Sequence, residues 1–122
     1  MQHSDDFNAL CDDAKQRIEE ITVEEAEQRL KNGSIDYLID VREQDEYANG
    51  HIPSAVHLSK GWIEAKIHHC VTDKNCEILL YCGGGNRSAL AADNLQKMGY
   101  KKVYSMSGGY KAWVQAGKAQ QA

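Results

Sequence analysis

The 122-residue sequence lacks several features that mark whole classes of protein. A single proline and the absence of any low-complexity stretch argue against a linker between domains. No apolar run is long enough to cross a bilayer, and the first residues lack the basic and then apolar pattern of an export signal. Four cysteines are too few for a disulfide scaffold at this length. We therefore expect one cytoplasmic domain with free thiols.

Acidic residues are also missing from one part of the chain. Nine of the eighteen acids lie in residues 1–30, and none follows Asp93, although five lysines do. The C-terminal part is therefore mildly basic, which favours a small anion or an acidic partner surface, unless it is an ordinary solvated face. Its basic density is far below that of nucleic-acid-binding proteins, so neither nucleic acid nor a membrane is an expected partner.

Apolar patterns predict strands that alternate with helices. Strands are expected at residues 35–41, 55–58, 77–81 and 102–106. Helices are expected at residues 7–18, 22–33, 44–48, 60–69, 88–98 and 109–116. This alternation, with short connections, predicts an α/β fold in which helices cover both faces of a parallel sheet. Ligands of such sheets bind beyond the carboxyl ends of the strands.

The most informative segment is the sequence Tyr-Cys-Gly-Gly-Gly-Asn-Arg-Ser at residues 81–88. It joins a buried strand to an expected helix, so backbone N–H groups and the positive end of the helix dipole meet in one small space. We expect the Cys82 thiol to ionise easily there, with Arg87 adding a positive charge. The alternative is a buried cysteine before an ordinary turn, for which three consecutive glycines would be a costly choice. The pattern favours a nucleophilic Cys82 that then carries an anionic group.

Four segments, in order, resemble a single rhodanese domain between about residues 21 and 113. They are Asp40-Val41-Arg42-Glu43, Gly50-His51-Ile52-Pro53-Ser54-Ala55, the loop from Cys82 to Arg87, and Ser107-Gly108-Gly109 with Ala112-Trp113. Ser54 stands where glycine is commoner in the family. The resemblance implies a five-stranded, mostly parallel sheet with helices on both faces, and sulfurtransferase activity. It divides the chain into an N-terminal helical extension (1–20), a rhodanese domain (21–117) and a C-terminal tail (118–122). We expect the last residues, 115–122, to fray.

The family's chemistry implies a role for each residue of the loop. Cys82 would attack the outer sulfur of an anionic donor such as thiosulfate and hold it as a persulfide. The backbone N–H groups of the residues that follow would bind this anionic sulfur: Gly83, Gly84, Gly85, Asn86, Arg87 and Ser88. An acceptor (cyanide, a thiol or a protein) would then remove it, and the cycle needs neither metal nor organic cofactor. Alternatively, the chain is a carrier module that delivers the Cys82 persulfide to a protein partner. A silent interaction domain is disfavoured because such domains commonly lose the cysteine.

Loop length separates this family from its neighbours. Cys82 to Arg87 is six residues, whereas related arsenate reductases and dual-specificity phosphatases carry one more around a tetrahedral oxyanion. Phosphatase activity is therefore the less expected one. Because the three glycines leave Arg87 as the only cation of the loop, attraction for the thiosulfate dianion is weakened. The persulfide of a protein or small thiol is thus a competing donor.

Two charged residues outside the loop match structural positions of the family. Asp40 is expected to brace the active-site loop through backbone N–H groups, and Arg42 to pair with Glu46. The histidine in the second segment, His51, is expected to be structural as well. His68, His69, Cys70 and Cys76 match no ordinary zinc spacing, so a metal site is not expected there.

Overall fold

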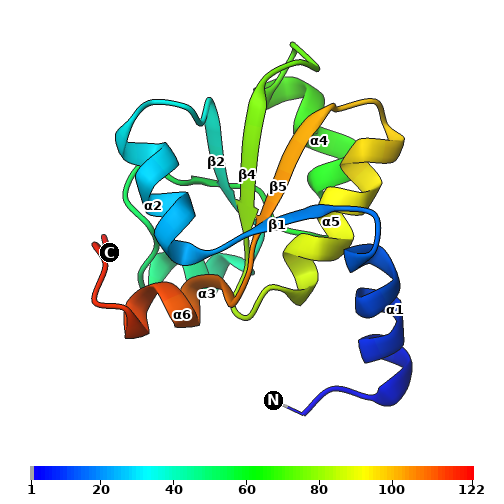
Figure 1. Cartoon of the computed structure of the whole chain (residues 1–122), viewed down its shortest axis with the longest axis horizontal. Helices are drawn as coiled ribbons and strands as arrows, with labels where there is room; N and C mark the ends of the chain where they lie inside the picture. Colours follow the sequence, from blue (N-terminus) through cyan, green and yellow to red (C-terminus); the bar gives the residue numbers. More distant parts are fainter. Residues whose placement is uncertain (1) are drawn as a thin grey trace.

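The computed structural model describes residues 2–122, and Met1, the first residue of the expected extension, lies outside them. Five strands form one sheet in the order β1-β5-β4-β2-β3, and every neighbouring pair is parallel (Figure 1). The strands are β1 (Glu19–Ile21), β2 (Tyr37–Asp40), β3 (Val56–His57), β4 (Glu77–Tyr81) and β5 (Lys102–Met106). The helices are α1 (Asp5–Lys15), α2 (Val23–Lys31), α3 (Gln44–Ala48), α4 (Ile63–Cys70), α5 (Asn86–Lys97) and α6 (Gly109–Gln115). The predicted α/β class with a five-stranded sheet is confirmed. No helix within residues 2–122 has the length and apolar character needed to cross a membrane.

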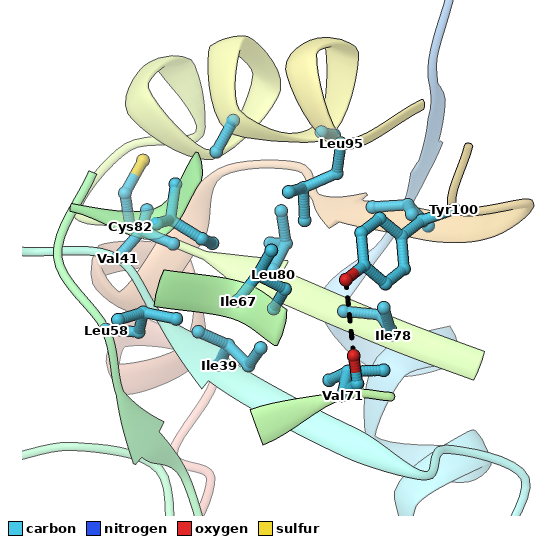
Figure 2. Packing of buried hydrophobic residues seen from close by; sticks show 14 residues of the cluster. Ile39, Val41, Leu58, Ile67, Val71, Ile78, Leu80, Cys82, Leu95 and Tyr100 are labelled. Carbon is cyan, nitrogen blue, oxygen red and sulfur yellow. Dashed lines mark hydrogen bonds between the residues drawn. The ribbon is translucent and has the colours of Figure 1, made fainter. Parts of the chain in front are cut away.

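The central strands are buried on both faces, which explains their nearly continuous apolar sequences. On one face, side chains of β2 and β4 such as Ile39 and Leu80 pack against α4 and α5 (Figure 2). There Ile67 and Leu95 supply the helical side of this core. The alternate strand residues point to the other face and form a second core with α2 and α6: Leu38, Leu79, Tyr81, Ala26 and Trp113. The loop from Cys82 to Arg87, the reactive loop, thus follows β4, the middle strand of the sheet.

The N-terminal extension is a helix that packs on the domain. Ser4 begins α1 by accepting a hydrogen bond from the Phe7 amide at 3.1 Å, a normal N-cap. Cys11 and Ala14 are buried on the face towards α5. Immediately after α1, Arg17 binds both carboxylate oxygens of Asp93 in α5, at 3.0 and 2.8 Å. Cys11 and Ala14 therefore mark the packed face of the predicted helix, whereas Leu10 is 55% exposed.

The C-terminal residues do not fray as expected. Gln121 forms an antiparallel bridge with His51, with backbone N–O distances of 2.8 and 2.9 Å. Lys118 reaches Glu27 of α2 at 2.8 Å, and the Trp113 indole donates to the Ala119 carbonyl at 2.7 Å. The expectation was wrong because these tertiary contacts bind a segment whose local sequence has no helix or strand pattern.

Candidate active site

The reactive loop lies where the parallel strands end. Asp40 at the end of β2 is in register with Tyr81 at the end of β4, and Ser105 of β5 is in register with Leu80. The segments after β2 and β4 therefore leave the sheet side by side, and Ser105 lies close to the first residues of α5. This arrangement brings together residues that are far apart in the sequence.

Glycine is required at two positions around the loop. Gly85 is the N-cap of α5 and has φ +103°, a region that L side chains rarely adopt. Gly109, with φ +61°, begins α6, and a Cβ there would lie 2.5 Å from the Cys82 carbonyl oxygen. This close approach lets the first turn of α6 hold the loop, because the Tyr110 amide donates to Cys82 O at 2.7 Å and the Lys111 amide to Gly83 O at 3.0 Å.

The Cys82 sulfur is buried, with 1% of the residue exposed, and hydrogen-bond donors converge on it. The Gly85 amide lies 3.1 Å from Sγ, and the Ser88 amide lies 3.3 Å from it. The Ser88 hydroxyl is 3.5 Å away and forms a 2.8 Å hydrogen bond with the Ser105 hydroxyl. Two backbone amides therefore donate to this sulfur, and a hydroxyl that can donate or accept lies beside them. Sequence reasoning predicted that six amides surround the sulfur. Within residues 2–122, the amides that donate to Sγ are those of Gly85 and Ser88.

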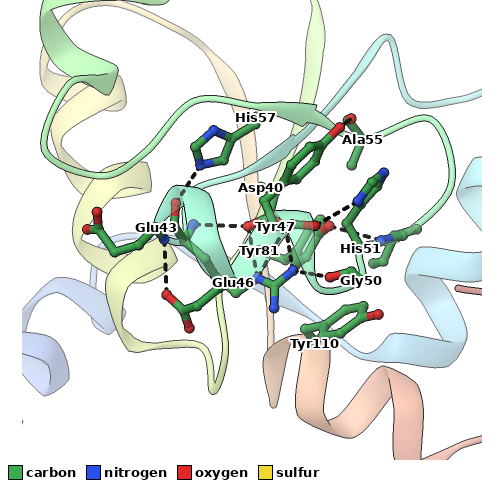
Figure 3. Close-up of polar contacts among 12 residues, drawn as sticks. Asp40, Glu43, Glu46, Tyr47, Gly50, His51, Ala55, His57, Tyr81 and Tyr110 are labelled. Carbon is green, nitrogen blue, oxygen red and sulfur yellow. Dashed lines mark hydrogen bonds and ion pairs between the residues drawn. The ribbon is translucent and has the colours of Figure 1, made fainter. Parts of the chain in front are cut away.

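Arg87 is not a free cation in this structure. Its guanidinium makes a two-pronged ion pair with Glu46 of α3, with N–O distances of 2.7 and 3.2 Å. The other contact of Glu46 is the Glu43 amide at 3.0 Å, which completes a capping box at the start of α3 (Figure 3). The Arg87 hydrogen bond holds the pKa of Glu46 below its usual value, and the Glu43 amide acts in the same direction against burial. The carboxylate is therefore charged at neutral pH, and the pair is formed.

The predicted pairing of Arg42 with Glu46 was wrong. Arg42 precedes α3 and turns inward, where its guanidinium binds both oxygens of Asp40 and, at 2.7 Å, the Gly50 carbonyl (Figure 3). Within residues 2–122, the hydrogen bonds to the Asp40 carboxylate come from the Arg42 side chain and from the Arg42 amide at 2.9 Å, and not from loop amides as expected. The guanidinium instead stacks 4.3 Å from the Tyr110 ring, and the Tyr110 amide holds the loop. Asp40 and Arg42 therefore support the loop indirectly, through Tyr110.

The histidines of this region have structural contacts. His51 Nδ1 lies 3.0 Å from the Tyr47 carbonyl, and the two rings stack at 3.9 Å. His57 Nε2 lies 2.7 Å from the Arg42 carbonyl. Across residues 2–122, no group of three or more His, Cys, Asp or Glu residues is placed to hold a metal ion, and all four cysteines are free.

A pocket of about 810 Å³ opens in front of the loop. Its walls come from four parts of the chain: the loop residues Cys82, Gly83, Gly84, Asn86 and Arg87, then Glu43 and Glu46, then Lys111, and finally His3 and Phe7. Sequence reasoning missed Glu43, Lys111, His3 and Phe7 as site residues, and it missed Ser105 as the partner of Ser88. Three of them carried a sequence signal: Glu43 ends the first of the four family-like segments, Lys111 is one of the five lysines after Asp93, and Phe7 begins the expected helix 7–18.

Comparison with known proteins now identifies the family. A family model for the rhodanese-like domain matches residues 22–116. The chain belongs to the rhodanese-like family. The family resemblance seen in the sequence is thereby confirmed, and sulfur transfer is the general activity that the family implies.

Three solved structures illustrate what this rhodanese-like chain resembles. A Rhodopseudomonas palustris protein of unknown function, described as a possible tyrosine phosphatase, is 30% identical, with 99% of this chain and 98% of that chain covered at a TM-score of 0.85. The Bacillus anthracis protein CoADR-RHD is 29% identical over 79% of this chain and 16% of that one, at 0.70. A thiosulfate sulfurtransferase from Pseudomonas aeruginosa is 21% identical over 88% of this chain and 21% of that one, at 0.80, a likeness of fold.

Proposed function

We propose that this chain is a sulfurtransferase that moves sulfane sulfur through a persulfide on Cys82. The observation that carries the proposal is the position of the buried Cys82 sulfur, 3.1 and 3.3 Å from the amides of Gly85 and Ser88. Amides fixed by a glycine turn and the start of α5 stabilise a thiolate without having to reorient. They would stabilise an anionic persulfide in the same way.

The reaction consists of two displacements. The Cys82 thiolate attacks the outer sulfur of the donor, the donor S–S bond breaks, and sulfite leaves with its electron pair when the donor is thiosulfate. A nucleophilic acceptor such as cyanide then attacks the terminal sulfur of the persulfide, forms thiocyanate and regenerates the thiolate. Each step exchanges one bond to sulfur for another, so the cycle is balanced without an external oxidant or cofactor. The Ser88 hydroxyl and the loop amides would donate hydrogen bonds to the negatively charged sulfur in both steps.

The ion pair between Arg87 and Glu46 bears on which donor the site takes. Thiosulfate would have to compete with a carboxylate for the only cation of the loop. A persulfide of a small thiol or of a protein needs less positive charge and is the competing donor. The second candidate function, a carrier that delivers the Cys82 persulfide to a protein acceptor, is favoured by the same neutralised cation. Free thiols suit a reducing compartment, and we propose the cytoplasm.

Phosphatase activity is the enzyme alternative suggested by the description of the Rhodopseudomonas palustris structure. A six-residue ring fits one sulfur atom but crowds the oxygens of a phosphoryl group. We therefore expect the wild-type protein to form thiocyanate from thiosulfate and cyanide and to leave an aryl phosphate intact. Cys82→Ser is the blank in both assays. Phosphate release without thiocyanate formation would overturn the proposal.

Inserting one residue between Gly85 and Asn86 provides a further test of loop size. The longer ring should lose sulfur transfer, because it displaces the Gly85 and Ser88 amides relative to the sulfur. Any phosphatase activity that the variant gains should be weak, because ester cleavage also needs a general acid. A variant that kept the wild-type rate of thiocyanate formation would show that the ring size does not matter.

A further inference from the structure

Helix α1 extends past the helix on which it packs. Its buried residue Cys11 lies against the very start of α5, where its sulfur is 4.0 Å from the Asn86 carbonyl oxygen. Phe7 is one turn earlier on the same face of α1. Figure 1 shows that the N-terminal part of α1 extends past the start of α5, and Phe7 belongs to this part of the helix. It lines the active-site pocket together with Cys82.

The position of α1 is fixed by polar contacts as well as by packing. Lys15 donates to the Asn86 side chain at 3.0 Å, and Arg17 binds Asp93 with two hydrogen bonds. These contacts tie the helix to the same element that begins with the sulfur-binding amides. These contacts therefore fix the position of the α1 side of the pocket relative to the loop.

Phe7 does not contribute to either hydrophobic core. It is half-buried and belongs to neither of the two core clusters. Within residues 2–122, its one aromatic contact is His3, at 4.7 Å between ring centroids, and His3 lines the same pocket. An aromatic ring that belongs to neither core cluster and lines the same pocket as Cys82 is available to a ligand.

The charges around the pocket nearly cancel. Arg87 is paired with Glu46, and the remaining two charged residues, Lys111 and Glu43, are of opposite sign. A dianion such as thiosulfate gains little from such a lining. The volume of about 810 Å³ is in the range of pockets that bind organic molecules, and a five-atom inorganic donor would fill a small part of it.

We propose that Phe7, with His3 beside it, is a specificity-determining wall that binds the organic group of a sulfur donor carrying a single negative charge. This inference rests on the proposed sulfurtransferase function and names the class of donor: an apolar group attached to the transferable sulfur. The wall lies outside residues 22–116, the part of the chain matched by the rhodanese-like model. The N-terminal extension thus completes the substrate pocket of the domain.

Two thiosulfonates test this wall because they share one reacting group and one charge. Benzenethiosulfonate and methanethiosulfonate both give their outer sulfur to the Cys82 thiolate, and the corresponding sulfinate leaves with the electron pair. The measurement is kcat/KM for each donor at fixed cyanide, expressed as the ratio of benzene to methane compound. Intrinsic differences in reactivity between the donors cancel when this ratio is compared between variants.

Phe7→Ala should lower the ratio about three- to tenfold, the effect of losing one aromatic contact, with little change for methanethiosulfonate. Leu10→Ala is the matched control, since Leu10 is on the same helix, is 55% exposed and does not line this pocket. It should leave the ratio unchanged. Phe7→Leu preserves helix propensity and apolar bulk without the ring, and should lower the ratio by a smaller amount.

An unchanged ratio in both Phe7 variants, with active proteins, would overturn the wall and leave the sulfurtransferase function intact. A ratio that fell equally in Leu10→Ala would also overturn it, because the effect would then come from the stability of α1. If no donor, thiosulfate included, loaded sulfur onto the wild-type protein, the proposed function itself would fail and this inference with it.

Discussion

Replacing Glu46 by glutamine tests how the charge of Arg87 is used. The substitution preserves the size of the side chain and an oxygen that can accept from the Glu43 amide, now 3.0 Å from Glu46. It removes the negative charge that binds Arg87 at 2.7 and 3.2 Å. The guanidinium should then be free to bind an anionic donor. We expect the KM for thiosulfate to fall.

The size of this effect follows from the exposure of the pair. A pair of unit charges 4 Å apart interacts by about 4 kcal/mol at an effective dielectric constant of 20, whereas exposed pairs contribute about 0–1 kcal/mol. The Arg87 and Glu46 side chains are 33% and 35% exposed, so solvent screens them substantially. We therefore expect a gain of about 1 kcal/mol in thiosulfate binding, or about a fivefold fall in KM.

The assay is thiocyanate formation at fixed cyanide and varied thiosulfate, at low and at moderate salt. Salt should raise the KM more in Glu46→Gln than in the wild type, because the variant exposes an unpaired cation. Glu64→Gln is a matched control: Glu64 is 31% exposed and bound to Lys60 and Asn94, outside the pocket. A folded Glu46→Gln protein with an unchanged or higher KM would refute the reasoning.

Three further predictions concern the loop and the N-terminal helix. Gly109→Ala should destabilise the protein by about 3 kcal/mol, because strain at positive φ adds to a 2.5 Å clash with the loop. The control Gly117→Ala, at φ +74°, meets no neighbour and should cost about 1 kcal/mol. Equal losses of unfolding free energy for the two variants, measured by urea unfolding, would contradict this. Ser88→Ala removes a hydroxyl 3.5 Å from the reactive sulfur and should slow sulfur loading about fivefold, and an unchanged single-turnover rate would exclude a role for it. The Arg17 hydrogen bond lowers the pKa of Asp93, so this contact stabilises α1 docking above about pH 4 and is lost as pH falls through the lowered value. Asp93→Asn should accelerate amide hydrogen exchange in α1 at neutral pH, and full protection there would count against the contact.

The parts of the fold that could be predicted depend on local patterns. The buried part of β4, residues 78–81, is apolar, and helix ends carry caps or glycines, so the alternation was visible in the sequence. Strand β1 was missed because it has three residues and only Ile21 is buried. Such a short edge strand exists through its pairing with β5, which no local signal reveals.

In the candidate site, too, local features were predictable and contacts between distant segments were not. The sequence around Cys82 predicted a strand, a glycine turn and a helix start, and the structure has all three. The partner of Arg87 was not predictable, because Glu46 is 41 positions away and reaches it only when β2 and β4 are neighbours in the sheet. The expected pairing of Arg42 with Glu46 fails because Arg42 lies before α3 and its guanidinium binds Asp40 instead.

The central claim, that Cys82 carries the transferred sulfur, is tested most directly by the intact mass of the protein after incubation with a sulfur donor. Wild-type protein should gain the mass of one sulfur atom, and cyanide should remove it with the release of one equivalent of thiocyanate. Cys82→Ser, in which the other three cysteines remain, should gain nothing. A wild-type mass that stays unchanged with thiosulfate and with both thiosulfonates, or a sulfur gain of equal size in Cys82→Ser, would contradict the account.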